Sequence, residues 1–401
     1  MIYQPPAGGR DLLPHDVAQK RWIEDRLEQV FQRWGYHRII TSTVETMETL
    51  MAGGAIEQSE VIELQRFQGG RLGLRPELTA SIARTAVTRL AAVTYPQRLY
   101  YSANVFQHTE TSSHGGQQEY YQAGVELLGA DGLTADAEVL LLLTDCLRGL
   151  NLTDTHIVLG EAALTYSLLS AFPETLRQQV RHAIATLDRV TLEALPLSES
   201  LQKRALRLMD LRGQPQAVLR SLQAFDLDLD QQAIVSHLKG LVELFETVEQ
   251  APALILDLSL IRTYDYYTGI VFEVVGQRRI LGQGGRYDHL LGVYHPQGES
   301  SPGIGFILNV EALHQVLLPS GQLPTETPPS DWLVVATQTD AIAAALAYAQ
   351  TIRQSANLVR VELHLDPETP PPTVREIAQK RRIGRIAWIA AQGLPEIEAL
   401  G

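Results

Sequence analysis

A long helical stretch lies between two groups of strand-like segments, and this order restricts the folds open to the chain. Apolar residues recur at helical spacing from about 162 to 250, where strand signals nearly vanish. Strand-like runs precede this stretch at 38–44, 71–75, 98–107 and 120–128, and return at 253–258, 270–275 and 279–281. The pattern indicates a helical insertion within a sheet-containing core.

Further signals place helices around this insertion. Apolar spacing predicts a helix over 14–34 and a buried helix over 133–150, the latter with Thr134 as its N-cap. Residues 211–215 read as a turn inside the insertion, and a last helix of the core begins near Asn309.

A proline-rich segment at 319–330 predicts a linker, which ends a core of residues 1–318. Beyond it, residues 331–401 alternate strand, helix, strand, helix and strand, as in a small α/β unit with a parallel sheet. At 401 residues the chain is long enough for two or three such domains.

The composition of the chain restricts its possible binding partners and its cellular compartment. The net charge of −13 is spread along the chain, which neither favours nor excludes nucleic acid. The single cysteine, Cys146, rules out an intrachain disulfide and lies in an apolar run too short for a membrane span. No secretory signal is visible, so we expect a cytoplasmic protein without membrane contact.

Several enzyme classes lack their motifs. No lysine precedes serine or threonine as in a P-loop, and no nucleophile elbow, HExxH motif or dinucleotide fingerprint occurs. The 11 histidines show no metal-ligand spacing. We therefore expect neither a metal nor a cofactor.

Polar residues in apolar surroundings mark a candidate ligand site. On a strand, Gln122, Gly124 and Glu126 share one face, which would present an amide, a gap and a carboxylate. A buried carboxylate needs a cationic or donating partner, and a ligand amine or imidazole would serve. An exposed strand face that meets water explains these residues equally well. Glu77 and Thr79 are polar residues of the same kind.

Residues 262–269 supply a second set of candidates. Arg262 carries a guanidinium suited to a carboxylate, and the phenols of Tyr266 and Tyr267 can line a pocket. The glycine-rich segment 282–288 would let backbone approach a ligand, although such a segment is more often only a tight turn.

These segments resemble the histidyl-tRNA synthetase family over nearly the whole chain. The matching segments are 9–14, 74–80, 122–129, 262–273, 284–288 and 303–306. The resemblance implies an α+β fold of the class II aminoacyl-tRNA synthetase type, with an antiparallel sheet flanked by helices.

The resemblance also assigns roles within a histidine pocket. Glu77, Thr79 and Gln122 match the group that holds the α-amine of histidine. Glu126 and Tyr267 match the imidazole contacts, and Arg262 matches the arginine that faces the carboxylate.

The ATP side of the family pattern is degenerate. Gln107 and Ala312 replace arginines that hold ATP phosphates, and a further expected arginine is absent near Gln118. The acidic residue of this motif fits Glu110 only with a shift, and Ser42 replaces a motif 1 proline. One lost electrostatic contact of this kind costs roughly two to three orders of magnitude in rate, so we expect no adenylate formation.

A non-catalytic branch of the family shares this pattern, namely the regulatory subunits of ATP phosphoribosyltransferase, which acts first in histidine biosynthesis. The likeness implies a homodimer, formed through the motif 1 region, within a hetero-oligomer that contains a short catalytic subunit. It also implies activation of that subunit and feedback by L-histidine. Residues 331–401 resemble a shortened anticodon-binding domain, so we expect no tRNA binding.

Two alternatives are kept open. The chain could be an active histidyl-tRNA synthetase with atypical motifs, which histidine-dependent ATP–pyrophosphate exchange would reveal. It could also be a stand-alone histidine-sensing module that signals to another partner.

Overall fold

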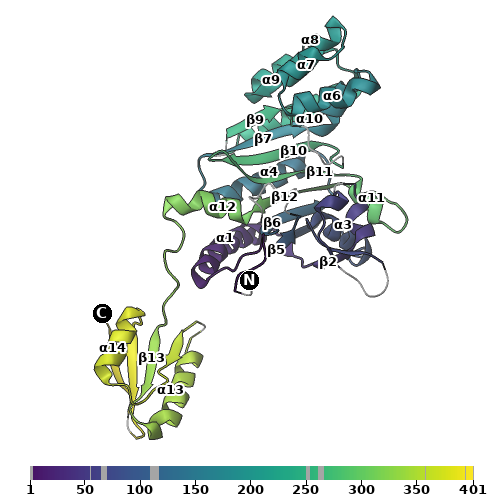
Figure 1. Ribbon diagram of the computed structural model, residues 1–401. Coiled ribbons are helices and arrows are strands. Elements are labelled where there is room, and N and C mark those ends of the chain that lie inside the picture. The colour runs from purple at the N-terminus through teal and green to yellow at the C-terminus, as the bar shows by residue number, and fades with distance from the viewer. Residues whose placement is uncertain are drawn as a thin grey trace. The chain divides into compact units, whose positions relative to one another are not determined.

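The computed structural model describes residues 3–54, 56–64, 70–108, 117–249, 253–260, 266–356, 358–392 and 394–400. The chain divides into two compact units, Met1–Pro324 and Thr325–Gly401. The division falls inside the proline-rich segment. Figure 1 shows the elements of each unit along the chain.

The described residues of the first unit form a nine-stranded sheet, in which eight strands come from the two sides of the insertion and β8 comes from inside it. In spatial order the strands are β1 (His37–Arg38), β5 (Gln97–Phe106), β6 (Glu119–Leu128), β12 (Gly303–Asn309), β11 (Arg279–Arg286), β10 (Ile270–Gly276), β7 (Thr155–Glu161), β9 (Ala253–Asp257) and β8 (Arg212–Gly213). Neighbouring strands are antiparallel except for the parallel pairs β1–β5 and β7–β9. The expected class II-type sheet is confirmed.

Helices cover the two faces of this sheet. Successive strand residues point to opposite faces, so Tyr100 and Val125 join a cluster with α1 (Pro14–Arg33), α4 (Leu133–Gly149) and α12 (Val310–Leu317). Tyr101 and Leu128 join a second cluster with α3 (Thr79–Thr88) and α11 (Leu290–Tyr294). Along β5 and β6, residues of the second cluster therefore alternate with residues of the first.

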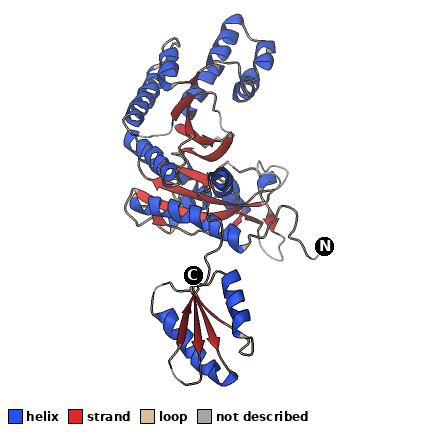
Figure 2. Cartoon of the chain, turned by 90° about the vertical axis from the view of Figure 1, so that its left-hand side faces the viewer, coloured by secondary structure: helices blue, strands red, loops and turns tan. Residues whose placement is uncertain are grey.

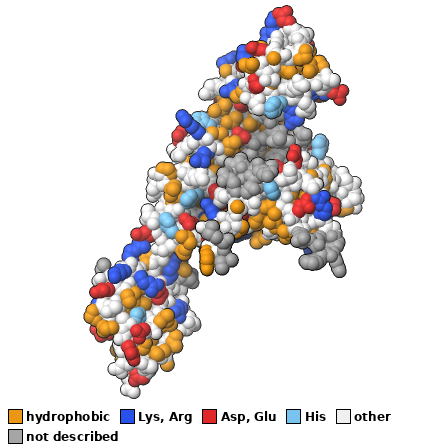
Figure 3. Space-filling model, viewed as in Figure 1, with side chains coloured by type: hydrophobic (Ala, Val, Ile, Leu, Met, Phe, Trp, Pro, Cys, Tyr) orange, Lys and Arg blue, Asp and Glu red, His pale blue; other side chains and the backbone are white. Residues whose placement is uncertain are grey.

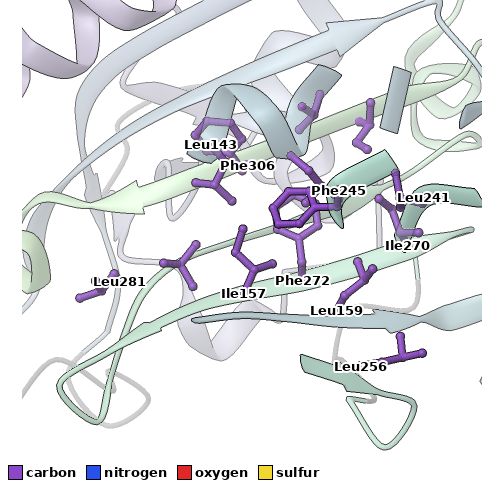
Figure 4. Packing of buried hydrophobic residues seen from close by; sticks show 14 of the residues in the cluster. Leu143, Ile157, Leu159, Leu241, Phe245, Leu256, Ile270, Phe272, Leu281 and Phe306 are labelled. Atoms are coloured by element: carbon purple, nitrogen blue, oxygen red, sulfur yellow. The ribbon is translucent and has the colours of Figure 1, made fainter. Parts of the chain in front are cut away.

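The predicted helical insertion is confirmed. Its helices are α5 (Ala162–Leu169), α6 (Glu174–Ala185), α7 (Arg189–Ala194), α8 (Glu199–Met209), α9 (Pro215–Leu222) and α10 (Leu229–Glu246). Figure 2 shows these helices gathered at one end of the sheet. Leu241 and Phe245 of α10 pack into the main core beside Ile270 and Phe272 of β10 (Figure 4). The insertion is thus continuous with the core of the first unit.

Three local expectations were wrong. Residues 211–215 are not simply a turn, because Arg212–Gly213 form β8 and pair with β9, and Pro215 then begins α9. Residues 38–44 do not form one strand, since β1 ends at Arg38 and Val44 begins β2 (Val44–Thr46). The N-cap of α4 is Gly132, with a φ of 82°, rather than Thr134.

A small three-stranded sheet accompanies α3 in the described part of the first unit. It contains β2, β4 (Leu72–Leu74) and β3 (Glu63–Leu64), and α2 (Met47–Met51) follows β2 directly. Two short 3₁₀ segments, η1 (Gln58–Glu60) and η2 (Leu318–Ser320), complete the elements of this unit.

The second unit is a four-stranded sheet between two helices, as far as its residues are described. The elements are β13 (Trp332–Ala336), η3 (Thr339–Ala341), α13 (Ile342–Gln354), β14 (Val361–Leu363), α14 (Pro371–Lys380), β15 (Arg385–Ile389) and β16 (Glu396–Ala399). The expected parallel pairing of three strands is confirmed. The antiparallel strand β16 on β15 was not predicted.

Candidate functional site

The site is organised around the carboxylate of Glu126 on β6. Its side chain is buried, with 1% exposure. Thr79, the first residue of α3, donates a hydroxyl hydrogen bond of 2.8 Å to Glu126 Oε1. The phenol of Tyr287, just after β11, donates to Glu126 Oε2. Two predicted residues, Glu126 and Thr79, are therefore brought together, and Tyr287 joins them.

Glycines on the neighbouring strands make room for these side chains. Gly305 of β12 pairs with Glu126 across the sheet, and a Cβ at this position would collide with Glu126 Oε2. A Cβ at Gly303 would collide with the ring of Tyr287, and one at Gly285 would lie 2.7 Å from the ring of Tyr267. The glycine-rich segments thus permit close approach and are more than simple turns.

Burial changes the charge of Glu126. Removal from water is the main reason that the pKa of this carboxyl is raised to about 8, and nearby Glu77 contributes to the increase. The hydrogen bonds from Tyr287 and Thr79 act in the opposite direction but are weaker. At neutral pH and without a ligand, the Glu126 carboxyl is therefore mostly protonated. A cationic or basic ligand would stabilise its ionised form.

Glu77 lies at the start of α3. Its carboxylate accepts hydrogen bonds from the backbone N–H of Thr79 at 2.5 Å and of Ala80 at 2.9 Å. Burial nevertheless raises the pKa of Glu77 above its ordinary value. A small cavity of about 10 Å³ opens beside it, lined by Glu77, Thr79 and Tyr266 among others, and is large enough for about one water molecule.

Aromatic rings form a wall next to the carboxyl groups of Glu77 and Glu126. The ring centroids of Tyr266 and Tyr267 lie 4.6 Å apart, and the ring of Tyr287 meets Tyr266 edge-on at 6.0 Å. Burial raises the pKa of Tyr266 and Tyr287 well above the ordinary value, so both phenols stay neutral donors. Such a wall suits a flat, polar ring.

Two further candidates complete the predicted set. Gln122 lies on the same strand as Glu126, separated from it by an even number of positions, so the two side chains share a face. Its side chain is buried, and its amide oxygen accepts no hydrogen bond from the described residues. Arg262 lies outside the described residues.

The positions expected to hold ATP phosphates carry no cation. Gln107 and Gln118 face each other just beyond β5 and β6, where Gln107 N donates to Gln118 O at 2.9 Å. Ala312 lies in the first turn of α12, and its N–H donates to the Asn309 side chain at 2.8 Å. Asn309 therefore acts as the N-cap of this helix. Glu110 lies outside the described residues.

Nearby arginines are already engaged in the framework. Arg75 donates to the backbone carbonyls of Thr41 at 3.0 Å, Asn104 at 3.1 Å and Ser42 at 3.3 Å. Arg10 lies 3.4 Å from the carboxylate of Glu311, which also accepts from Tyr121 N at 3.0 Å. Neither arginine replaces the missing phosphate contacts.

Tyr287 is the site residue that residue-by-residue reasoning missed. It belongs to the glycine-rich segment 282–288, which was singled out only for its backbone. A phenol next to three glycines was the available signal.

In the part of the chain that is described, no group of three or more His, Cys, Asp or Glu side chains could hold a metal, and no helix is long and apolar enough to cross a membrane.

Comparison with known proteins gives consistent matches over the whole chain. The sequence model of the histidyl-tRNA synthetase family matches residues 8–313. A protein from Nostoc sp. (strain PCC 7120) named ATP phosphoribosyltransferase regulatory subunit is 60% identical, with 99% of each chain covered. A protein of the same name from Gloeothece citriformis is 57% identical, with 100% of each chain covered.

Solved structures agree with these sequence matches. A crystal structure from Bacillus halodurans, described as an ATP phosphoribosyltransferase regulatory subunit/histidyl-tRNA synthetase, has a TM-score of 0.82 and 26% identity, and covers 98% of this chain and 100% of its own. Histidyl-tRNA synthetase from Nostoc sp. PCC 7120 has a TM-score of 0.77 at 20% identity, covering 99% of this chain and 97% of its own, and shows likeness of fold alone.

Proposed function

The chain belongs to the histidyl-tRNA synthetase family and, within it, to the regulatory subunits of ATP phosphoribosyltransferase, and from this premise we propose that it controls a short catalytic subunit in response to L-histidine. It activates that subunit in the first step of histidine biosynthesis and performs no catalytic step of its own. Histidine binds at Glu126 and transmits feedback to the partner.

The observation that carries the proposal is the buried Glu126 carboxyl between Thr79 and Tyr287. Two hydroxyl donors hold it in place, while burial keeps its pKa at about 8. A ligand that supplies a basic nitrogen would stabilise the ionised form of this carboxyl. Of the common amino acids, histidine combines such a nitrogen with a flat ring that suits the wall of Tyr266 and Tyr267.

The other predicted residues receive roles in the same pocket. Glu77, Thr79 and Gln122 face the ammonium group of histidine, and the buried acceptor oxygen of Gln122 supports this assignment. Arg262 is assigned to the carboxylate of histidine from the family resemblance alone. ATP is not a ligand in this proposal, because Gln107, Gln118 and Ala312 offer no positive charge.

The assembly is proposed as a cytoplasmic hetero-oligomer that contains a homodimer of this chain. The dimer would form through the edge of the sheet near β1 and Ser42. On the face shown in Figure 3, Lys and Arg side chains of the first unit lie interspersed with Asp and Glu side chains. A dispersed charge of this kind does not favour a nucleic-acid backbone, so tRNA is not a partner in this proposal.

The test is phosphoribosyl-ATP formation by the short catalytic subunit of the same organism, with and without this chain, over a histidine titration. We expect this chain to raise the rate and histidine to suppress it again. The variant Glu126→Gln should retain activation but lose histidine suppression. Glu48→Gln, on the exposed surface of α2, removes one carboxylate elsewhere and serves as the matched control.

Two outcomes would contradict the proposal. If the chain neither changes the rate nor forms a complex on a sizing column, the regulatory role fails. If activation occurs and Glu126→Gln remains fully sensitive to histidine, the regulatory role stands and the assignment of the pocket is wrong.

A further inference from the structure

A buried arginine lies directly behind the proposed histidine pocket. Arg286 is the last residue of β11 and precedes Tyr287, so the two side chains point to opposite faces. The side chain of Arg286 is 6% exposed. It packs against Gly269, where an added Cβ would lie 3.0 Å from Arg286 Cδ. Arg286 thus supports the strand end that carries Tyr287.

The same arginine fixes the segment that follows Tyr267. The backbone carbonyl of Arg286 accepts a hydrogen bond of 2.8 Å from Thr268 N. Its guanidinium donates to Asp288 at 3.0 Å, and Asp288 in turn accepts from the hydroxyl of Thr268 at 2.9 Å. The backbone and the side chain of Arg286 therefore both hold the segment after Tyr267 next to the end of β11.

The charge of Arg286 is balanced from α4. Its Nε and Nη2 atoms donate to Asp136 Oδ1 at 2.9 Å and 2.6 Å, and the Asp136 side chain is only 2% exposed. Two such hydrogen bonds on a buried ion pair fix the guanidinium tightly. The remaining oxygen of Asp136 needs its own partner, because a buried carboxylate oxygen left unpaired is costly.

That partner comes from the helical insertion. His237 of α10 lies with its Nε2 atom 2.8 Å from Asp136 Oδ2. The hydrogen bond to Asp136 raises the pKa of His237, which favours the charged donor form. A second link runs through the backbone, where Ala162 N, at the start of α5, donates to Gly269 O at 2.9 Å. The insertion thus contacts the segment after Tyr267 directly through Ala162, and Arg286 indirectly through Asp136.

We propose that the chain of contacts from Arg286 through Asp136 to His237 couples occupancy of the histidine pocket to the position of α10. This rests on the proposed function, because it takes histidine as the pocket ligand. His237 acts as a positioning residue: it holds Asp136, Asp136 holds Arg286, and Arg286 holds the walls of the pocket. Linkage makes the effect reciprocal, so a partner that displaces α10 weakens histidine binding.

The test measures histidine binding to the full-length chain by calorimetry. We expect His237→Ala to weaken binding by about fivefold or more, since couplings between sites are typically 5- to 150-fold. His237→Gln retains an N–H donor and should recover most of the affinity. Lys239→Ala breaks an exposed pair with Glu243 on the same helix and should leave binding unchanged.

Hydrogen exchange supplies a second readout, whose first part uses only the wild-type chain. In the wild-type chain, histidine should slow amide exchange in residues 229–246, and His237→Ala should abolish that slowing. Unchanged affinity in His237→Ala, or no histidine effect on these amides, would overturn the coupling while leaving the pocket in place. If the wild-type chain binds no histidine at all, both this inference and the proposed pocket fail.

Discussion

Thr79 Oγ1 lies 2.8 Å from Glu126 Oε1, a hydrogen bond between residues 47 positions apart in sequence. One residue begins a helix and the other lies inside a strand, so only the folded chain brings them together. The bond orients a carboxylate that has little contact with water. Together with the hydrogen bond from Tyr287 to Glu126 Oε2, it fixes the orientation of this carboxylate.

Replacing Thr79 by valine should weaken histidine binding by about 10- to 100-fold, because a hydrogen bond to a charged group contributes about 1.5–3 kcal/mol. Valine preserves the shape of the side chain but removes the donor. Calorimetric titration with histidine provides the measurement. Thr79→Ser keeps the hydroxyl and should stay near the wild-type value; equal affinity for the valine and serine variants would exclude this role.

Histidine affinity should peak between about pH 6.5 and pH 8. The Glu126 carboxyl holds a proton below its pKa of about 8, and free imidazole gains one below about 6.5. In the complex, the Glu126 carboxyl and the imidazole together hold one proton. Below about pH 6.5 the free partners hold two protons, so binding must release one, and above about pH 8 they hold none, so binding must take one up. Affinity falls on both sides of the window. Titrations across this range should show the maximum in wild type, and a flat wild-type profile would contradict it.

Glu126→Gln should stabilise the chain against unfolding, and more so as the pH rises. The folded-state pKa of Glu126 is raised from 4.5 to about 8, so the unfolded chain loses this proton first. Between these values the wild-type free energy of unfolding falls, relative to the variant, by about 1.4 kcal/mol per pH unit. Urea unfolding of both proteins at several pH values measures the difference.

The control for this series is Glu48→Gln, whose carboxylate is exposed. Its difference from wild type should be the same at each pH. If the difference in unfolding free energy between Glu126→Gln and wild type stays constant from acid to alkaline pH, the pKa of Glu126 is not raised in the folded chain.

The chain should not catalyse histidine-dependent ATP–pyrophosphate exchange. Gln107 and Ala312 provide no positive charge, and each lost contact costs roughly two to three orders of magnitude. The histidyl-tRNA synthetase of Nostoc sp. PCC 7120 is a suitable positive control, since it shares the fold. Exchange at a rate comparable with that enzyme would restore the synthetase alternative.

Much of the fold could be predicted from periodicity because long elements carry their own signal. The helix at 14–34 and the strands near 98–107 and 120–128 match α1, β5 and β6 within about two residues. β8 could not be predicted in this way, since it has two residues and exists only because β9 offers a partner. The same holds for β16, which depends on pairing with β15.

The candidate site, like the fold, could be predicted only in part. Glu77, Thr79 and Glu126 were predicted as unusual polar groups, and the structure brings them into one constellation. Tyr287 and His237 were not, because their partners lie 161 and 101 residues away in sequence. A tyrosine or histidine seen alone gives no sign of the carboxylate that it contacts.

Because α10 and the sheet share one hydrophobic core, the insertion is not a separable module. Residues 162–250 look like an independent cassette in the sequence, yet Leu241 and Phe245 occupy the same interior as Phe272 (Figure 4). Excising the cassette would uncover β10 and leave Asp136 without His237. We therefore expect that residues 1–324 melt as one cooperative body, and that no minimal sensor can be obtained by trimming the insertion away.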